Sequence, residues 1–549
     1  MLYTLQNVND YRMENIMKIL FIVVLGGDLV RSTEHLGVAY LSSYLQEKGY
    51  TDVSIKEVFG IADKKNLEDA LKEEYDVVGF STTCVAMREI INIGNAVKEK
   101  YPNTHITMGG HMATFWGKEI LERYSCVDST MRGEGEITCY ELIKATEKKE
   151  SLENIEGITY KQNNEVIANP DRLLMKDLDV LPFPVRNQFE LHDNRFQYLR
   201  ICSSRGCLGK CGFCSSYVGR TQKDFCWRGR SPKNVADEVE ELVKKYNFHT
   251  YDFVDSTFED PGEFGKQRIG QIAHELIDRD LNIFYNCCFR AEDWYDSDRE
   301  LLRFLIDSGL EKVNIGFESG NDRGLKLLYK RARSKDNQRV IKLLADFPEI
   351  YITFGFIMFH PDSILEDLKD NADFLYGTGI GQVIRHYFWK LEVYPATAIE
   401  EKLKKAGRIT VDYDICDGMY AYEFLNPKVS KISDICQKLL SIQEVWDFEI
   451  FDILVHTFIS RMLRKYSNSE IKDELDEFIA YVNGVRAEMA KYNHEFFMDI
   501  YDHTDEIDVD EKAAVLKQHI KEKMALISNK EYRFGMNLKR RGYELVQKY

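Results

Sequence analysis

The sequence predicts an α/β protein in three parts: a Rossmann-like open parallel sheet, a partial (β/α)6 barrel and a helical C-terminal domain. Three observations predict this fold class. Short β-branched apolar runs alternate with amphipathic stretches up to about residue 150, a second such series begins at 198, and helical spacing alone continues after about 406. Alternating strands and helices are typical of parallel sheets that helices cover. We expect domains over 1–150, 198–405 and 406–549, with a linker over 151–197.

Length and charge narrow the class of protein. The chain has 549 residues, enough for several cores, and its net charge is −17. No run of Lys and Arg forms a basic stripe, so we expect no nucleic-acid partner. The longest apolar runs, such as 19–25, are far shorter than the roughly 20 residues that span a bilayer, so we expect a cytoplasmic protein without a membrane partner. Residues 1–16 show no periodicity, which makes Met17 an alternative start.

The first series predicts a ligand edge. Its expected strands are 18–25, 75–81 and 105–110, and its expected helices are 35–45, 87–101 and 117–124. The carboxyl ends of parallel strands form the usual ligand crevice of an open sheet. Small or polar residues gather there, namely Gly26-Gly27, Ser81-Thr82-Thr83, Gly109-Gly110-His111 and Gly133-Glu134-Gly135-Glu136. Glycines also end strands and cap turns, but four such clusters on one edge favour the close approach of a large flat ligand.

The second series predicts six βα units, and therefore an open barrel. The linker precedes this series. It contains a predicted hairpin at 157–169 and ends in Leu181-Pro182-Phe183-Pro184. Proline disfavours helix in the residue before it, so the end of this segment should run extended. The expected strands are 198–203, 250–255, 282–287, 312–317, 351–359 and 383–391, and the expected helices are 231–246, 262–277, 297–308, 335–345 and 364–376.

Three cysteines directly follow the first barrel strand. Cys207, Cys211 and Cys214 stand in CLGKCGFC, in a loop where βα barrels build their active sites. Twelve cysteines in an intracellular chain favour thiols, metal ligands or catalytic groups over disulfides. Three thiolates hold three corners of a cubane iron–sulfur cluster and leave one iron open for reaction. The alternative is a structural zinc ion with Cys202 or Cys226 as fourth ligand.

This CxxxCxxC, with Phe213 before its last cysteine, resembles the radical S-adenosylmethionine (SAM) superfamily. Other segments resemble the subgroup that has an N-terminal cobalamin-binding domain, the class B radical SAM methyltransferases. The resemblance covers about residues 18–405. The segments are Gly133–Glu136 (GEGE), Leu181–Pro184 (LPFP), Asp252–Asp255, Gly316–Gly320 (GFESG), Met358–Pro361 and Tyr394–Thr397.

The resemblance implies three cofactors and the residues that hold them. A [4Fe–4S] cluster would be bound by Cys207, Cys211 and Cys214. SAM would be bound by Phe213, Asp255, Arg290, Glu318, Ser319 and the backbone at Met358. Cobalamin would lie against Ser81, Thr82, Gly109, Gly110, His111, Glu134 and Gly135. The chain lacks an Asp-x-His-x-x-Gly motif after its first strand, so we expect no histidine on the lower face of cobalt.

The implied activity is methyl transfer to an unactivated carbon of a small molecule or peptide by way of a 5′-deoxyadenosyl radical. An electron donor such as flavodoxin or ferredoxin would reduce the cluster. Hydrogen abstraction by a radical needs no general base, so we assign no catalytic side chain. The alternatives are a radical cyclase or rearrangement enzyme in which cobalamin is no methyl donor, and a non-catalytic cobalamin-binding regulatory protein.

Three details qualify the resemblance. Thr83-Cys84-Val85 is similar to a stretch of methylthiotransferases, but Cys84, Cys126 and Cys139 do not follow the first strand, so we expect no second cluster. Ala396 stands where the Tyr-Pro-x-Thr turn usually has Gly, and a positive φ would strain it. Alternation turns one sulfur of Cys287-Cys288 into the barrel, where core packing is the favoured role over substrate contact.

Overall fold

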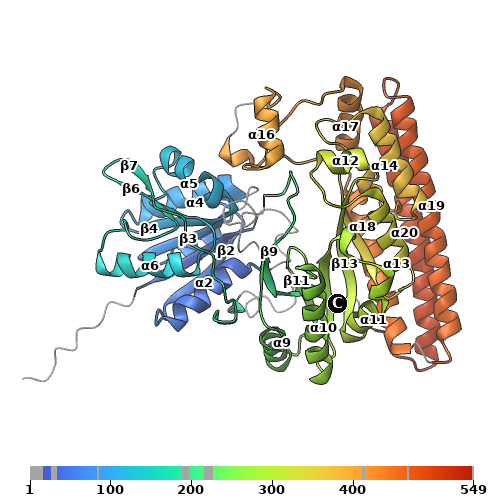
Figure 1. Ribbon diagram of the computed structural model, residues 1–549, viewed down its shortest axis with the longest axis horizontal. Helices are drawn as coiled ribbons and strands as arrows, with labels where there is room; N and C mark the ends of the chain where they lie inside the picture. The colour runs from blue at the N-terminus through green and yellow to red at the C-terminus, as the bar shows by residue number, and fades with distance from the viewer. Residues whose placement is uncertain are drawn as a thin grey trace, which may run out of the picture. The chain divides into compact units, whose positions relative to one another are not determined.

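The computed structural model describes residues 17–25, 34–82, 86–187, 197–215, 227–410, 414–466 and 469–546. The chain divides into two compact units. Unit 1 consists of residues 1–175, 180–196 and 415–418, and unit 2 consists of 176–179, 197–414 and 419–549. Figure 1 shows the elements of each unit.

Unit 1 is built on a seven-stranded sheet with the order β2-β1-β3-β4-β5-β6-β7. Strands β1 to β5 pair in parallel, and β6 and β7 continue the sheet in antiparallel pairing. Because β1 pairs with both β2 and β3, the strand order reverses beside β1, which makes this the topological switch point. The strands are β1 (Ile19–Val24), β2 (Val53–Val58), β3 (Val77–Thr82), β4 (His105–Gly110), β5 (Ser129–Met131), β6 (Ile158–Gln162) and β7 (Glu165–Ala168).

Helices cover both faces of this sheet, with α2 and α6 packed together on one face and α4 and α5 on the other (Figure 1). Every residue of β1 is buried, as expected for a strand covered on both faces. The predicted strands of the first series are confirmed, and the hairpin at 157–169 pairs with β5 rather than standing apart from the sheet. The helices are α2 (Leu36–Glu47), α3 (Lys64–Ala70), α4 (Met87–Lys100), α5 (His111–Arg123) and α6 (Glu136–Lys148).

Unit 2 contains a five-stranded parallel sheet with the order β14-β13-β12-β11-β8, and helices follow its strands as in a barrel. A short antiparallel pair, β9 (Ser204–Gly206) and β10 (Trp227–Gly229), flanks the cysteine loop. The sheet strands are β8 (Leu199–Ile201), β11 (Thr250–Phe253), β12 (Phe284–Phe289), β13 (Leu310–Glu318) and β14 (Tyr351–Phe356). The helices are α9 (Pro232–Tyr246), α10 (Gly262–Asp278), α11 (Arg299–Ser308), α12 (Asp322–Leu327), α13 (Ser334–Leu344) and α14 (Leu365–Gly377).

The predicted sixth strand, 383–391, is wrong over most of its length. Residues Arg385–Phe388 form the short helix α15, and only Lys390 makes a parallel bridge, to Phe359. The run misled the prediction because His386, Tyr387 and Phe388 are all buried. A short apolar run that is buried on all sides has no periodicity that separates strand from helix.

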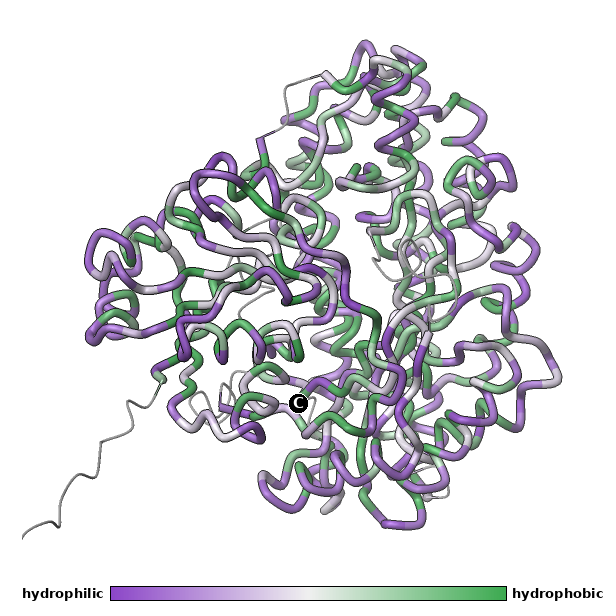
Figure 2. Tube along the Cα trace, turned by 60° about the vertical axis from the view of Figure 1, so that its left-hand side comes forward, coloured by the Kyte–Doolittle hydropathy of each residue, from purple (hydrophilic) through white to green (hydrophobic). Residues whose placement is uncertain are grey.

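The C-terminal part of unit 2 is helical, as predicted. Its helices are α16 (Ala398–Lys405), α17 (Pro427–Leu440), α18 (Gln443–Tyr466), α19 (Lys472–Asp502) and α20 (Val509–Arg540). The last three share a hydrophobic core that includes Phe458, Phe478 and Phe534. Hydrophobic and hydrophilic stretches alternate along the chain (Figure 2), and none of the described helices is long and apolar enough to cross a membrane.

Candidate cofactor sites

The cysteine loop begins directly after β9 and gathers two sulfurs over one glycine. The Gly209 amide donates to Cys207 Sγ at 3.2 Å. A Cβ on Gly209 would lie 3.2 Å from Cys207 Sγ and 3.8 Å from Cys211 Sγ. A residue without a side chain therefore leaves the space beside both sulfurs open. Cys214, the third predicted ligand, is exposed.

Three segments that are distant in sequence hold this loop. The Leu208 amide donates to Asp260 Oδ2 at 3.2 Å. The Gly212 amide donates to the Leu328 carbonyl at 2.9 Å, and the Ile399 amide donates to the Gly212 carbonyl at 3.1 Å. Backbone bonds of this kind fix the path of the loop whatever its side chains bind.

Burial makes the loop thiols hard to ionise without a cation. It raises the pKa of Cys211 to about 11, an effect that the nearby Lys330 ammonium opposes. It also raises the pKa of Cys207, whose sulfur lies 3.7 Å from Thr257 Oγ1. A bound metal deprotonates such thiols, so these residues suit metal ligation better than free thiolate chemistry.

The described residues form no tight ligand group of the kind that a single zinc ion needs. A zinc ion draws its ligands into one tight tetrahedron, whereas each thiolate of a cubane binds a different iron. Within the described residues, no three His, Cys, Asp or Glu side chains are grouped tightly enough for a single metal ion. Cys202, a candidate fourth zinc ligand, donates its thiol to the Ser204 carbonyl at 3.3 Å. The other candidate, Cys226, lies outside the described residues.

Glu318 ends β13 with its carboxylate inside the barrel. Its φ is 61°, and the pairing of β13 with β14 shifts register between Gly316 and Glu318. Glu318 Oε1 lies 3.7 Å from Lys330 Nζ, and a Cβ on Gly316 would lie 2.5 Å from the same oxygen. Burial raises the pKa of Glu318, and Lys330 opposes this effect. Glycine at 316 therefore leaves room for a carboxylate and ammonium pair near the cysteine loop.

Arg290, at the end of β12, connects to the cysteine loop through one carboxylate. Its guanidinium pairs with Asp260, which also accepts the Leu208 amide, and its Nε donates to Asp293 Oδ2 at 2.9 Å. The Arg290 amide donates to Glu259 Oε1 at 2.7 Å. In this arrangement Arg290 positions the loop, and the guanidinium group of Arg290 is already paired with carboxylates of the protein.

The other residues predicted to bind SAM are mostly engaged within the protein. Asp255 accepts hydrogen bonds from Ser203 Oγ at 2.7 Å and from Ser204 Oγ at 2.8 Å. Ser319 Oγ donates to Asn371 Oδ1 at 2.9 Å. Met358 is completely buried, and Phe213 is half-buried within the loop.

In unit 1 the predicted cobalamin residues meet at the carboxyl edge of the sheet. Thr82 Oγ1 donates to the Gly109 carbonyl at 2.6 Å and accepts the Ala113 amide at 3.1 Å. Gly110 has a φ of 91°, and a Cβ there would lie 2.8 Å from the Thr82 carbonyl oxygen. Only glycine fits this close approach of β3 and β4. Ser81 is half-buried, and His111, the first residue of α5, is exposed.

The segment after β5 completes this edge. The Gly133 amide donates to Thr114 Oγ1 at 3.1 Å, and Glu134 Oε2 accepts the Met175 amide at 3.1 Å. Gly135 precedes α6, and a Cβ there would lie 3.2 Å from Leu41. The edge is thus lined by backbone and small side chains, which fits a large planar ligand. Gly26, Gly27, Thr83 and Cys84 lie outside the described residues.

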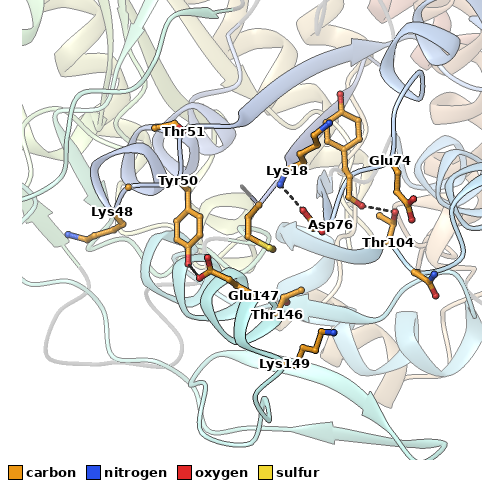
Figure 3. A pocket seen from close by; sticks show the side chains of 14 residues that line it. Lys18, Lys48, Tyr50, Thr51, Glu74, Asp76, Thr104, Thr146, Glu147 and Lys149 are labelled. Carbon is orange, nitrogen blue, oxygen red and sulfur yellow. Dashed lines mark hydrogen bonds between the residues drawn. The ribbon is translucent and has the colours of Figure 1, made fainter. Parts of the chain in front are cut away.

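A hollow of about 1130 Å³ opens at the opposite, amino-terminal edge of the same sheet (Figure 3). Several polar groups that line this hollow form hydrogen bonds with one another. The Lys18 amide donates to Asp76 Oδ2 at 2.8 Å, and Tyr50 OH donates to Glu147 Oε2 at 3.0 Å (Figure 3). None of the predicted cobalamin residues lines it.

Sequence reasoning missed Lys330, Asp260 and Gly212, which hold the loop or its surroundings. A Cβ on Gly212 would lie only 2.0 Å from the Tyr329 ring. These residues join segments that lie far apart in the chain, and no local motif marks them. Asp260 could have been sought as a carboxylate shortly after the second barrel strand, the position from which barrel loops reach a site.

Comparison with known families matches both units. The B12 binding domain matches residues 22–143, and the Radical SAM superfamily matches residues 201–375. An uncharacterized methyltransferase of Pyrococcus horikoshii is 27% identical over 346 residues, covering 62% of this chain and 72% of that protein. The anaerobic magnesium-protoporphyrin IX monomethyl ester cyclase of Rubrivivax gelatinosus is 29% identical over 335 residues, 58% of each chain.

A solved structure shows the same fold. The cobalamin-dependent S-adenosylmethionine radical enzyme OxsB, with aqua-cobalamin bound, superposes with a TM-score of 0.68 at 20% identity and covers 96% of this chain and 81% of that one. The two domains define a radical SAM enzyme with a B12-binding domain. The chain thus carries a B12 binding domain followed by a Radical SAM domain, the pair that the resemblance implied. The cofactors of these domains are a [4Fe–4S] cluster, SAM and cobalamin.

Proposed function

We propose that the chain is a methyltransferase that adds a methyl group to an unactivated carbon of a small molecule or peptide. When bound, the cluster and SAM supply hydrogen-atom abstraction, and cobalamin supplies the methyl group. The observation that carries this proposal is the cysteine loop, with Cys207 and Cys211 over Gly209 and no tight single-metal group among the described residues. The methyltransferase relative supports the choice of reaction.

Each group of residues has a proposed part. Cys207, Cys211 and Cys214 ligate the cluster, and Asp260, Leu328 and Ile399 hold their loop in place. Glu318, with Lys330 beside it, is proposed to bind the polar part of SAM, and Phe213 and the backbone at Met358 are proposed to border its adenine. Arg290, Asp255 and Ser319 position these elements through the carboxylate and hydroxyl contacts described above. Ser81, Thr82, Gly109, Gly110, His111, Glu134 and Gly135 are the proposed cobalamin edge.

SAM labelled in its methyl group tests the reaction before the substrate is known. The enzyme is purified anaerobically with cobalamin, reduced by flavodoxin or ferredoxin, and incubated with the labelled SAM. We expect label on the extracted corrin and release of 5′-deoxyadenosine. The variant with Cys207, Cys211 and Cys214 all changed to Ala should release none, whereas Cys416→Ala, a thiol of unit 1, should behave as wild type.

Two other results would identify the alternatives. Release of 5′-deoxyadenosine from an enzyme whose corrin stays unlabelled would favour a cyclase or rearrangement enzyme, the class to which the Rubrivivax relative belongs. A protein that binds corrin but neither labels it nor cleaves SAM, with its cluster intact, would be a regulatory protein.

A further inference from the structure

The inner face of the five-stranded sheet carries side chains that keep exposed surface, and we call the space beside this face the lumen. On β13 the residues Val313, Ile315 and Phe317 have no exposed surface. The residues that alternate with them keep exposed surface, because Lys312 and Gly316 are half-buried and Asn314 is exposed. On the neighbouring strand β12, Asn286 and Cys288 share one face, where Asn286 is buried and Cys288 is half-buried. Successive side chains of a strand point to opposite faces, so the second set faces the inside of the barrel. Its exposure shows that the helices leave this space unfilled.

The lumen wall is polar in two successive layers. Strand register places Arg200 beside Asp252, Asp252 beside Asn286, and Asn286 beside Lys312. In the next layer, Cys288 stands beside Asn314 and Asn314 stands beside Thr353. The second layer is joined by contacts of Asn314 Nδ2 with Cys288 Sγ at 3.9 Å and of Thr353 Oγ1 with Asn314 Oδ1 at 3.3 Å.

Lys312 is the second cation of this wall, after Arg200. Among the described residues its ammonium makes no hydrogen bond and no ion pair, and it lies 5.0 Å above the Tyr198 ring. Asp252 is the acid of the same layer, and Arg200 Nε lies 3.9 Å from its Oδ2. Burial raises the pKa of Asp252, and Lys312 opposes this effect more than Arg200 does.

Three carboxylates on β13 and α18 form ion pairs with arginine side chains. Glu311 pairs with Arg461 at 2.9 Å, Glu449 pairs with Arg385, and Asp452 pairs with Arg486 at 2.8 Å. The first layer of the wall therefore contains two cations, Arg200 and Lys312, and one acid, Asp252.

We propose that the lumen takes a polar substrate whose anionic group, a carboxylate or a phosphate, pairs with Lys312 and also reaches Asn314. This assignment rests on the proposed function, because it makes the lumen the place of the substrate. A charge-assisted hydrogen bond to an ammonium is strong where water is partly excluded, and the adjacent amide adds a second donor. Asn314 is exposed in the layer directly above Lys312, on the side toward Glu318.

Alkylation of Cys288 tests the charge of the lumen without any turnover. The holoenzyme is treated with anionic iodoacetate or with neutral iodoacetamide, and mass spectrometry gives the rate of each at Cys288. The ratio of the two rates does not depend on how much of the thiol is ionised. We expect Lys312→Met to lower this ratio about fivefold, because the ammonium attracts the anionic reagent across a few ångströms.

Matched variants and competitors separate the outcomes. Lys312→Arg should keep the ratio, and Lys342→Met, an exposed lysine on α13, should leave it unchanged. Inorganic phosphate or acetate should slow the iodoacetate reaction in wild type only, and the stronger competitor identifies the anion class. An equal ratio in wild type and Lys312→Met, or a Cys288 that neither reagent reaches, would overturn the proposal. Because no SAM is consumed, this result is independent of whether methyl transfer occurs.

Discussion

Gly212 is a residue at which the cysteine loop passes very close to Tyr329. A Cβ there would lie 2.0 Å from Tyr329 Cδ2, and the Gly212 amide and carbonyl both make backbone hydrogen bonds. Gly212→Ala should therefore displace the loop, cost about 1–3 kcal/mol and lower the iron content. Gly484→Ala, in α19 with nothing within 4 Å of the added methyl group, is the control. Iron and sulfide counts equal to wild type in Gly212→Ala would contradict this view of the loop.

Glu259 is a buried carboxyl group that should make stability depend on pH. It has no exposed surface, its Oε1 accepts the Arg290 amide, and Oε2 has no partner among the described residues. Burial raises the pKa of Glu259 to about 8. The folded chain thus holds this proton more tightly than the unfolded chain. Its contribution to stability is complete below the unfolded pKa near 4.5 and is lost as pH rises through 8.

Glu259→Gln keeps the shape and removes the titration. Between pH 6 and pH 9 the wild type should lose about 2–3 kcal/mol relative to this variant. Thermal midpoints of both proteins, measured anaerobically across that range, check the prediction. A difference between the two proteins that stays constant with pH would show that Glu259 ionises freely in the fold.

At the scale of elements, one buried ion pair joins the C-terminal helices to the barrel. Arg461 on α18 pairs with Glu311 on β13 through both carboxylate oxygens at 2.9 Å, and both side chains are almost fully buried. Arg461→Met would leave the Glu311 charge buried alone and should cost about 3–5 kcal/mol. The double variant Glu311→Gln with Arg461→Met should recover much of this loss. Urea unfolding of the three proteins measures it, and a double variant no more stable than Arg461→Met would show that packing of Arg461 dominates.

Helices and strands were predictable from the sequence where the hydrophobic periodicity of a segment matches the pattern of its buried residues. The strands β1, β3 and β4 were found because β-branched apolar runs of their length fit a sheet covered on both faces, and β11 to β14 were found because they alternate with amphipathic stretches. The segment at Arg385–Phe388 failed because a short run that is buried all round fits a helix equally well. At Ala396 the sequence suggested a turn that differs locally, because a positive φ strains alanine, but Ala396 keeps a positive φ of 58°.

The candidate sites were predictable only where a local motif marks them. Three cysteines in eight residues identify the cluster loop, and strand ends identify the cobalamin edge. The contacts that hold the loop join Leu208 to Asp260 and Gly212 to Leu328, across tens of residues. Such pairs depend on the tertiary fold, so spacing in the sequence does not reveal them.

At the scale of the whole molecule, the residues proposed for each cofactor lie within one unit. The cysteine loop and its supports belong to unit 2, and the edge at Thr82, Gly110 and Gly135 belongs to unit 1. Each unit has its own sheet and its own core, so loss of one set of ligands need not unfold the other unit.

This separation predicts that one variant loses only the cluster and another loses only cobalamin, when both are purified anaerobically with cobalamin. Changing Cys207, Cys211 and Cys214 to Ala should abolish iron and sulfide and leave the extracted corrin unchanged. Gly110→Val should do the reverse, because its side chain would clash with the Thr82 carbonyl at a φ of 91° and distort the cobalamin edge. Gly37→Ala, on α2 with nothing within 4 Å of the added methyl group, is the matched control, and circular dichroism checks folding. If either variant lost both cofactors while remaining folded, binding of cluster and corrin would have to be coupled across the chain.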